Sequence, residues 1–239
     1  MSDPTHDVRT VTTDSGDLPV HRWLPPSGTG PGLLLLQEIF GVSDYIRGRA
    51  ADLARAGYVV YAPQLYWRLD AGELDEKDPD LLGRGMALAQ QLPWADALAD
   101  ARAGLTALRA APEVSGGVGV IGFCYGGGLA FNVAALEPVD ALVSYYGSAL
   151  PNLLDLAQAV GTPSLHHFGT ADAYIPLDVV EKIRAAVTAD NDRAEFELHD
   201  GAGHAFDNPN PAFHHAGASA AAWPHTLAFL DEHLGAAQG

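Results

Sequence analysis

Short apolar runs recur along the chain, and each has about the length of one β-strand. They cover residues 32–37, 58–62, 117–122, 139–146, 163–168 and 194–199. Apolar residues fill these runs almost continuously, which is typical of strands that are covered on both faces of a sheet. We therefore predict that these ranges form the strands of a predominantly parallel sheet.

Helical patterns lie between the apolar runs. The best patterned one carries four apolar residues at helical spacing before a break at Pro112: Leu98, Ala101, Leu105 and Leu108. The last helical pattern, at residues 217–234, places four apolar residues on one face: Trp223, Leu227, Leu230 and Leu234. Strands that alternate with helices indicate βαβ crossovers. The chain is therefore predicted to have an α/β fold, with a doubly wound, mostly parallel sheet of about eight strands.

The N-terminal region has a different pattern. Two β-branched stretches, at residues 8–13 and 18–23, flank the turn-rich quartet Asp14-Ser15-Gly16-Asp17, which predicts an antiparallel hairpin. No internal repeat or long linker divides the chain, so residues 1–239 are expected to form one domain without a large cap domain. The polar segment at residues 70–80 is expected to be a solvated loop or the start of a helix.

Composition and charge narrow the classes of partner. The chain has 13 Lys and Arg residues against 30 Asp and Glu residues, which gives a formal charge of −17. Such a surface repels nucleic-acid phosphates and anionic lipid headgroups, so neither nucleic acid nor a membrane surface is an expected partner. No apolar run approaches the ~20 residues of a membrane span, and the first residues lack the layout of a signal peptide. We expect a cytoplasmic protein that is a monomer.

The single cysteine, Cys124, excludes an internal disulfide and a zinc site with several cysteines. It lies in Gly122-Phe123-Cys124-Tyr125-Gly126, between a predicted strand and a segment compatible with a helix. This is the G-x-C-x-G pattern of a nucleophile elbow, with Cys in the usual place of Ser. The elbow needs its glycines because side chains two positions before and after the nucleophile would collide. The helix N-terminus would favour the thiolate. The alternative is an inert buried thiol in a glycine-rich turn.

A nucleophile needs a base, and the base needs a group that orients it. Asp172 follows the predicted strand that ends in HHFGT, and His204 lies in GAGHAF after the strand that ends in FELH. The order Cys124, Asp172, His204 is the order of α/β-hydrolase triads, and each residue follows a strand end. Two alternatives remain: Asp178, inside the next helical pattern, could replace Asp172, and His204 could be an ordinary surface histidine.

Two pairs of adjacent histidines raise the question of a metal. They are His166-His167 and His214-His215. Neighbouring residues on a strand point to opposite faces, and no cluster of carboxylates accompanies either pair. We therefore expect no metal ion and no other cofactor.

The loop after the first parallel strand carries a further candidate group. Its sequence is Gln37-Glu38-Ile39-Phe40-Gly41. Such loops supply one amide of the oxyanion hole, here expected from Ile39, while the residue after the nucleophile, Tyr125, supplies the second. A carboxylate desolvated in this place can exchange a proton with the thiol, so Glu38 is expected to modulate Cys124. The alternative is that Glu38 caps the following helix.

Several motifs together resemble the dienelactone hydrolase family (carboxymethylenebutenolidase-like proteins) of the α/β-hydrolases. They are QEIFGV at residues 37–42, YAPQLY at 61–66, GFCYGG at 122–127, YYG at 145–147 and GAGHAF at 201–206. The resemblance implies a triad of Cys124, His204 and Asp172, in which Glu38 contacts the resting thiol and yields it when substrate binds.

The resemblance also implies a reaction. Cys124 attacks a lactone or ester carbonyl, the amides of Ile39 and Tyr125 hold the oxyanion, and an acyl-enzyme forms. The leaving group of a lactone stays tethered to the acyl-enzyme, so the released enolate can itself activate water for the second step.

Substrate contacts are also implied by the resemblance. The candidates are Arg84, Phe40, Tyr145 and Asn208. Family members hold a substrate carboxylate with two arginines, one before the central helix, where Arg84 fits, and one at the position that is Asn208 here, beside Asp207. An amide next to a carboxylate disfavours an anionic ligand. The helix after Arg84 also has Leu88 and Gln91 where bulky rings would narrow a pocket.

We therefore predict a small lactone or carboxylic ester as the substrate. The alternatives are a thioesterase or acyl transferase on the same fold, and a scaffold that binds a small molecule without catalysis.

Overall fold

The structure is a computed structural model that describes residues 3–69, 71 and 74–235. The described residues belong to two compact units, one within Met1–Val118 together with Gly235, and the other at Gly119–Leu234. Asp70, Gly72 and Glu73 of the acidic segment lie outside the described residues. The described part of that segment is irregular, and the next helix begins at Leu81.

The first unit begins with the predicted hairpin. Strand β1 (Thr5–Thr13) pairs antiparallel with β2 (Gly16–Leu24), and the register runs from Thr5 opposite Leu24 to Thr13 opposite Gly16. Strand β2 then pairs antiparallel with β4 (Val59–Pro63), which pairs parallel with β3 (Gly30–Leu36). Every residue of β3 and β4 is buried, as their continuous apolar sequences predict.

Three helices and a 3₁₀ turn complete the first unit. Helix α1 (Asp44–Arg55) begins at the N-cap Ser43, whose hydroxyl accepts a hydrogen bond from the amide of Ile46 at 3.4 Å. The alternative role of Glu38 as the cap of this helix is therefore wrong. The 3₁₀ turn η1 (Leu65–Leu69) precedes α2 (Leu81–Gln91) and α3 (Trp94–Arg109).

Helix α3 carries the predicted apolar face with two differences. Ala101, Leu105 and Leu108 are fully buried, but Leu98 is only half-buried, and the acid Asp100 is buried in the same helix. The Asp100 carboxylate accepts hydrogen bonds from Arg68 and from the indole of Trp67. Because Arg68 neutralises the carboxylate and both partners donate hydrogen bonds to it, Asp100 fits in a core that its charge would otherwise exclude.

Strand β5 (Val114–Phe123) leads from the first unit into the second, which is a parallel sheet. Its second half pairs parallel with β6 (Ala141–Tyr145), β6 pairs parallel with β7 (Ser164–Gly169), and β7 pairs parallel with β8 (Ala194–His199). The described residues thus contain eight strands, mostly parallel, with an antiparallel N-terminal hairpin. The predicted fold class is confirmed.

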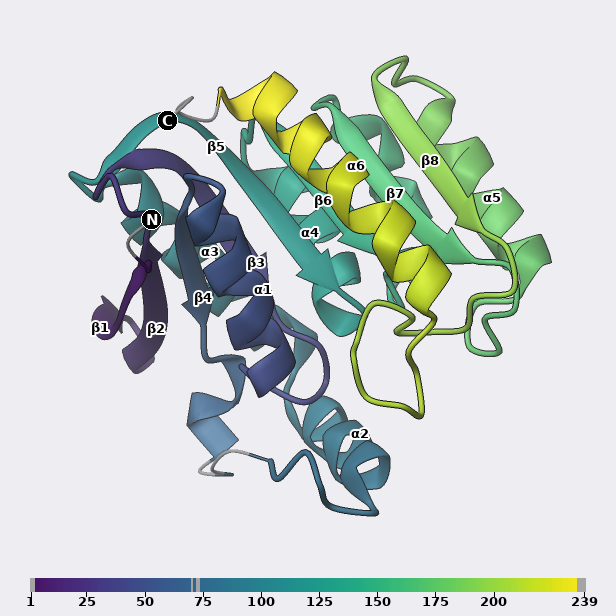
Figure 1. Ribbon diagram of the computed structural model, residues 1–239, viewed down its shortest axis with the longest axis horizontal. Coiled ribbons are helices and arrows are strands. Elements are labelled where there is room, and N and C mark those ends of the chain that lie inside the picture. Colours follow the sequence, from purple (N-terminus) through teal and green to yellow (C-terminus); the bar gives the residue numbers. More distant parts are fainter. Residues whose placement is uncertain (1–2, 70, 72–73, 236–239) are drawn as a thin grey trace. The chain divides into compact units, whose positions relative to one another are not determined.

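Helices cover both faces of this parallel sheet (Figure 1). Helix α6 (Ala216–Leu234) lies across β6 and β7 on one face, while α4 (Tyr125–Leu136) and α5 (Leu177–Thr188) lie on the other. The short turns η2 (Leu150–Asn152) and η3 (Leu154–Ala159) follow β6.

The buried face of α6 differs from the predicted stripe. Leu230 and Leu234 are buried as expected, but Trp223 and Leu227 are only half-buried. Small or polar residues take much of the contact instead: Ala218, Ala222 and Thr226 are buried together with Phe229. The hydroxyl of Thr226 lies 2.6 Å from the Tyr145 hydroxyl and 3.1 Å from Nε2 of His167, which explains why a threonine faces the sheet.

No described helix is both long enough and apolar enough to span a lipid bilayer.

Candidate active site

Cys124 occupies a sharp turn between β5 and α4. Its φ of 54° lies in the left-handed region, where a non-glycine residue is strained. A Cβ atom on Gly122 would lie 2.0 Å from the carbonyl oxygen of Gly126, so the turn requires glycine there. The backbone carbonyl of Cys124 accepts hydrogen bonds from the amides of Gly127, at 3.0 Å, and Ser148, at 3.1 Å. The elbow geometry predicted from the glycine pattern is therefore present.

A chain of two hydrogen bonds joins Cys124, His204 and Asp172. The Sγ atom of Cys124 lies 3.0 Å from Nε2 of His204, and Nδ1 of His204 lies 2.7 Å from Oδ2 of Asp172. The three residues follow the carboxyl ends of β5, β8 and β7, so one edge of the second unit's sheet brings them together. Cys124 as a whole is buried, with 8% of the residue exposed.

The carboxylate of Asp172 is held on both oxygens. While Oδ2 faces His204, Oδ1 accepts the backbone amides of Tyr174, at 2.8 Å, and Ile175, at 3.0 Å. The rival acid Asp178 is exposed in the first turn of α5 and forms an ion pair with Lys182 at 3.3 Å. The structure therefore brings Asp172, and not Asp178, to the histidine.

The surroundings of His204 favour its charged form. Burial disfavours the imidazolium, but the negative charge of Cys124 and the hydrogen bonds to Asp172 and Cys124 outweigh it, and they raise the pKa of His204 to about 10. The arrangement therefore favours an imidazolium at His204, next to the sulfur of Cys124.

Backbone strain in the described residues is concentrated around this cluster. Their non-glycine residues with positive φ are Cys124, Tyr146 at 37° and Ala205 at 57°. Tyr146 directly follows β6, and its ring lies 5.2 Å from the imidazole of His204, while Ala205 follows His204 in the chain. Strain of this kind persists only where the surrounding packing enforces it, and it is common at functional sites.

Three residues near the cluster were not identified from the sequence. The ring of Tyr146 contacts one side of His204, the ring of Tyr174 makes an edge contact with it at 5.2 Å, and the Ser148 hydroxyl lies 3.9 Å from Sγ of Cys124. Tyr146 belongs to a motif that the resemblance had marked. Ser148 and Tyr174 lie in irregular loops, where no periodic pattern distinguishes them.

The second unit places two predicted substrate contacts deep in the protein. Tyr145 has no exposed surface, and its hydroxyl bonds Thr226 of α6, so it lies in the core rather than at a surface that a ligand can reach. This placement corrects the expectation that it contacts substrate. Asn208 is 3% exposed, and its Oδ1 accepts the amide of Asn210. Its neighbour Asp207 accepts a hydrogen bond from Ser219 at 2.6 Å.

The remaining candidates belong to the first unit. Glu38 is buried and forms an isolated bridge with Gly41, and the carbonyl of Ile39 accepts the hydroxyl of Tyr66 at 3.0 Å. Phe40 is buried against Gly85 of α2, where a Cβ atom would lie 2.9 Å from its ring.

Arg84 lies inside α2 rather than before it, in the same helix as Leu88 and Gln91. Its side chain is exposed and forms an ion pair with Asp78 at 2.7 Å.

The paired histidines of β7 are buried in the core. His166 contacts Phe131 of α4 and His167 contacts Thr226 of α6, so the two side chains point to opposite faces as predicted. Burial lowers the pKa of His166 to about 4 and also lowers that of His167, which keeps both neutral. His215 accepts the amide of Ala218 at the start of α6. The part of the chain that the structure describes contains no cluster of three or more metal-binding side chains.

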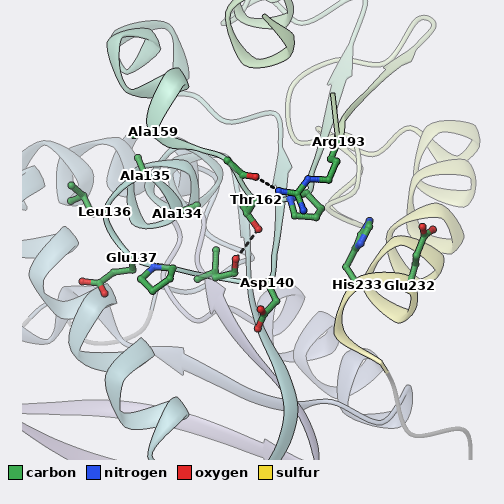
Figure 2. Close-up of a pocket in the computed structure, with 14 residues that line it drawn as sticks. Ala134, Ala135, Leu136, Glu137, Asp140, Ala159, Thr162, Arg193, Glu232 and His233 are labelled. Atoms are coloured by element: carbon green, nitrogen blue, oxygen red, sulfur yellow. Dashed lines mark hydrogen bonds between the residues drawn. The ribbon is translucent and has the colours of Figure 1, made fainter. Parts of the chain in front are cut away.

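A cavity of about 620 Å³ lies away from this cluster (Figure 2). Val139, Pro163 and Arg193 line it, and they precede β6, β7 and β8, so the cavity is at the amino ends of these strands, whereas Asp172 and His204 follow the carboxyl ends of β7 and β8. Its lining hydroxyl, Thr162, donates to the carbonyl of Val139, and Arg193 donates to the carbonyl of Gly161. The lining also includes His233 and Glu232, but it contains none of the three residues of the Cys124 cluster.

Comparison with known proteins gives a consistent result. The model of the dienelactone hydrolase family matches residues 21–234. A carboxymethylenebutenolidase of Pseudomonas sp. (strain P51) is 37% identical over 192 residues, which are 80% of each chain. A carboxymethylenebutenolidase of Pseudomonas putida is 33% identical over 207 residues, or 86% of this chain and 87% of that protein.

The solved structure of a putative dienelactone hydrolase from Klebsiella pneumoniae subsp. pneumoniae MGH 78578 superimposes on this chain with a TM-score of 0.83 at 28% sequence identity. It covers 97% of this chain and 100% of that one. The resemblance seen in the sequence motifs is thus confirmed, and the chain belongs to the dienelactone hydrolase family and is an ester or lactone hydrolase with the α/β-hydrolase fold.

Proposed function

We propose that the protein is a cysteine-dependent hydrolase of lactones or small carboxylic esters. In this proposal Cys124 is the nucleophile, His204 is the general acid and base, and Asp172 orients His204. The observation that supports it most is the continuous hydrogen-bond chain, 3.0 Å from thiol to imidazole and 2.7 Å from imidazole to carboxylate. These are the contacts that an activated nucleophile requires.

The first half of the reaction transfers the acyl group to the enzyme. The thiolate sulfur of Cys124 forms a bond to the carbonyl carbon, and the carbonyl electrons move to the oxygen. When the tetrahedral intermediate collapses, the bond to the leaving oxygen breaks, and the imidazolium of His204 gives that oxygen its proton. The products of this half are a thioester on Cys124 and an alcohol, or a tethered enol in a lactone.

The second half returns the enzyme to its resting state. Neutral His204 accepts a proton from water, the hydroxide attacks the thioester carbonyl, and the carbon–sulfur bond breaks to release the acid and the thiolate. When the substrate is an enol lactone, the leaving oxygen can instead depart unprotonated as a tethered enolate while His204 keeps its proton, and this enolate then takes the proton from the attacking water. Such assistance suits a thiol enzyme, which is otherwise a poor esterase.

The oxyanion of each tetrahedral intermediate needs hydrogen-bond donors. The backbone amide of Tyr125 is the first of helix α4 and directly follows Cys124, which is the position of an oxyanion donor in this fold. The second amide, from Ile39, and the control of the thiol by Glu38 stay predictions from the sequence, as does the contribution of Phe40 and Arg84 to substrate binding.

The substrate we propose is uncharged. The resemblance implies that Asn208, beside the acid Asp207, takes the place of an arginine in family members that bind a carboxylate, and the whole chain carries a formal charge of −17. Both features disfavour an anionic ligand. We further propose that residues 1–239 form one domain, that the protein is monomeric and that it is cytoplasmic. The family match over residues 21–234, which includes most of both units, supports the single domain.

The decisive experiment measures turnover of 4-nitrophenyl acetate, enol lactones and an acyl thioester by the wild type, Cys124→Ala and Cys124→Ser. We expect the alanine variant to lose turnover and the wild type to show one added acyl group by intact-protein mass spectrometry after rapid quenching. Lys182→Ala, a change at an exposed residue of α5, is the control for handling and stability. Equal turnover by wild type and Cys124→Ala would exclude the proposed mechanism.

A further inference from the structure

Tyr174 is held beside His204 by a fixed backbone. Its amide donates to Oδ1 of Asp172 at 2.8 Å, and the next amide, of Ile175, donates to the same oxygen at 3.0 Å. The Ile175 side chain is 1% exposed, which anchors the loop from its other side. The same carboxylate therefore orients the imidazole and fixes the backbone that carries Tyr174.

The side chain of Tyr174 is nevertheless exposed. It is 61% exposed, and its ring meets the imidazole of His204 edge-on, with 5.2 Å between the ring centroids. The other ring that contacts this imidazole, Tyr146, has no exposed surface. One ring thus supports His204 from the core, and the other presents an aromatic surface to solvent next to it.

A single exposed apolar side chain is common on protein surfaces and by itself indicates no function. Tyr174 differs from the other exposed large apolar residues of the described chain, because it alone among them is aromatic, and its ring contacts the imidazole of His204. The combination of exposure, a fixed backbone and contact with the base indicates a role in binding.

The direction of the reaction indicates which part of a substrate Tyr174 meets. His204 delivers its proton to the leaving oxygen, so the leaving group departs on the side of the imidazole. A group attached to that oxygen extends past the imidazole edge, where the exposed ring of Tyr174 lies. Aromatic rings contact flat apolar groups favourably, in stacked or edge-to-face geometry.

We propose that Tyr174 forms the surface that binds the leaving group, and that it makes the enzyme prefer planar, apolar leaving groups, as in aryl esters and enol lactones, over alkyl ones. This inference rests on the proposed function and adds a substrate preference to it. The phenol hydroxyl is not required, because the contact is made by the ring.

The test compares two acetate esters whose leaving groups are similarly acidic but differ in shape: phenyl acetate and a fluorinated alkyl acetate. Both substrates give the same acetyl-enzyme, so the ratio of their kcat/KM values reports leaving-group recognition in the first half of the reaction. The variants are Tyr174→Ala, Tyr174→Phe and, as a matched control, Leu177→Ala, which removes another exposed apolar side chain close by in the chain.

We expect Tyr174→Ala to lower kcat/KM for phenyl acetate about tenfold, equal to ~1.4 kcal/mol, and to leave the fluoroalkyl ester within about twofold of wild type. Tyr174→Phe and Leu177→Ala should resemble the wild type on both esters. The rate at which iodoacetamide alkylates Cys124 should not change in any variant, because the thiol and its base keep their contacts.

An equal loss on both esters, or no loss on either, would overturn the preference. A change in the alkylation rate would also overturn it, because Tyr174 would then act by positioning His204. These outcomes can be told apart from failure of the proposed function. If the proposed function fails, Cys124→Ala keeps full turnover, independently of the results with the Tyr174 variants.

Discussion

His204 and Asp172 form a 2.7 Å hydrogen bond in which the imidazole Nδ1 faces a carboxylate with no exposed side-chain surface. This bond orients the ring so that Nε2 faces the sulfur of Cys124. It also contributes to the high pKa of His204, about 10, together with the negative charge of Cys124. Removing the carboxylate charge should therefore change both the titration and the reaction.

Asp172→Asn should lower the pKa of His204 and reduce kcat by about 10³- to 10⁴-fold, because an amide neither stabilises the imidazolium nor holds the correct tautomer. Nuclear magnetic resonance of the imidazole nitrogens measures the titration directly. A pKa raised on folding adds stability that is complete below 6.5 and disappears as the pH rises through about 10. The alkaline loss of stability should thus be smaller in the variant. An unchanged titration would contradict this prediction.

Ser148→Ala should slow the alkylation of Cys124 about two- to fivefold, equal to ~0.5–1 kcal/mol, because the hydroxyl 3.9 Å from the sulfur can donate to the thiolate. The ultraviolet absorbance of the thiolate as a function of pH provides a second measurement. Ser148→Thr keeps a hydroxyl and is the matched control. Identical reactivity of the alanine variant and the wild type would show that the hydroxyl does not act on the thiol.

Gly122→Ala should abolish activity and destabilise the fold, because its Cβ atom would lie 2.0 Å from the carbonyl oxygen of Gly126, which is backbone and cannot rotate away. Gly48→Ala is the matched control. Gly48 lies in α1 with no atom within 4 Å of the added carbon, so this change should add about 1 kcal/mol of stability. Urea unfolding monitored by circular dichroism measures both. A stable, active Gly122→Ala protein would be the contrary result.

The protein should lose stability in mild acid through His166, one of the two core histidines of β7. Burial lowers the pKa of His166 to about 4. Between pH 6.5 and 4 this histidine is therefore protonated in the unfolded chain and neutral in the folded chain. The free energy of unfolding should then fall by about 1.4 kcal/mol per pH unit between 6.5 and 4 from this residue alone. In His166→Gln this part of the slope should disappear. A parallel pH dependence in both proteins would assign the acid sensitivity elsewhere.

The strands could be predicted because a short, continuous apolar run between helical patterns is typical of a strand that is buried on both faces. The buried face of α6 could not, since the residues against the sheet include Ala218, Ala222 and Thr226, which hydrophobic periodicity undervalues. Thr226 faces inward because two buried polar groups on different strands, Tyr145 and His167, need its hydroxyl. Only the tertiary structure brings these partners together.

In the candidate active site, too, some features could be predicted from the sequence and others depend on the tertiary structure. The elbow around Cys124 is encoded locally, by glycines at fixed spacing, and could be predicted from the sequence. The choice between Tyr145 and Tyr146 could not, because β6 ends between them and Tyr146 then takes a positive φ that turns its ring toward His204. Tyr174 and Ser148 lie in loops whose course depends on hydrogen bonds to Asp172 and Cys124, and no pattern in the chain records such bonds.

The positive φ of Tyr146 is maintained by the packing of its own ring. Glycine at that position would relieve the backbone, but it would also remove a ring that has no exposed surface and packs against His204 and Phe206. The cavity left by a large buried aromatic side chain costs about 3–5 kcal/mol, which exceeds the roughly 1–3 kcal/mol of one strained residue. The stability of this part of the core and the placement of the ring beside His204 therefore depend on the same side chain, and a change at this residue should lower both together.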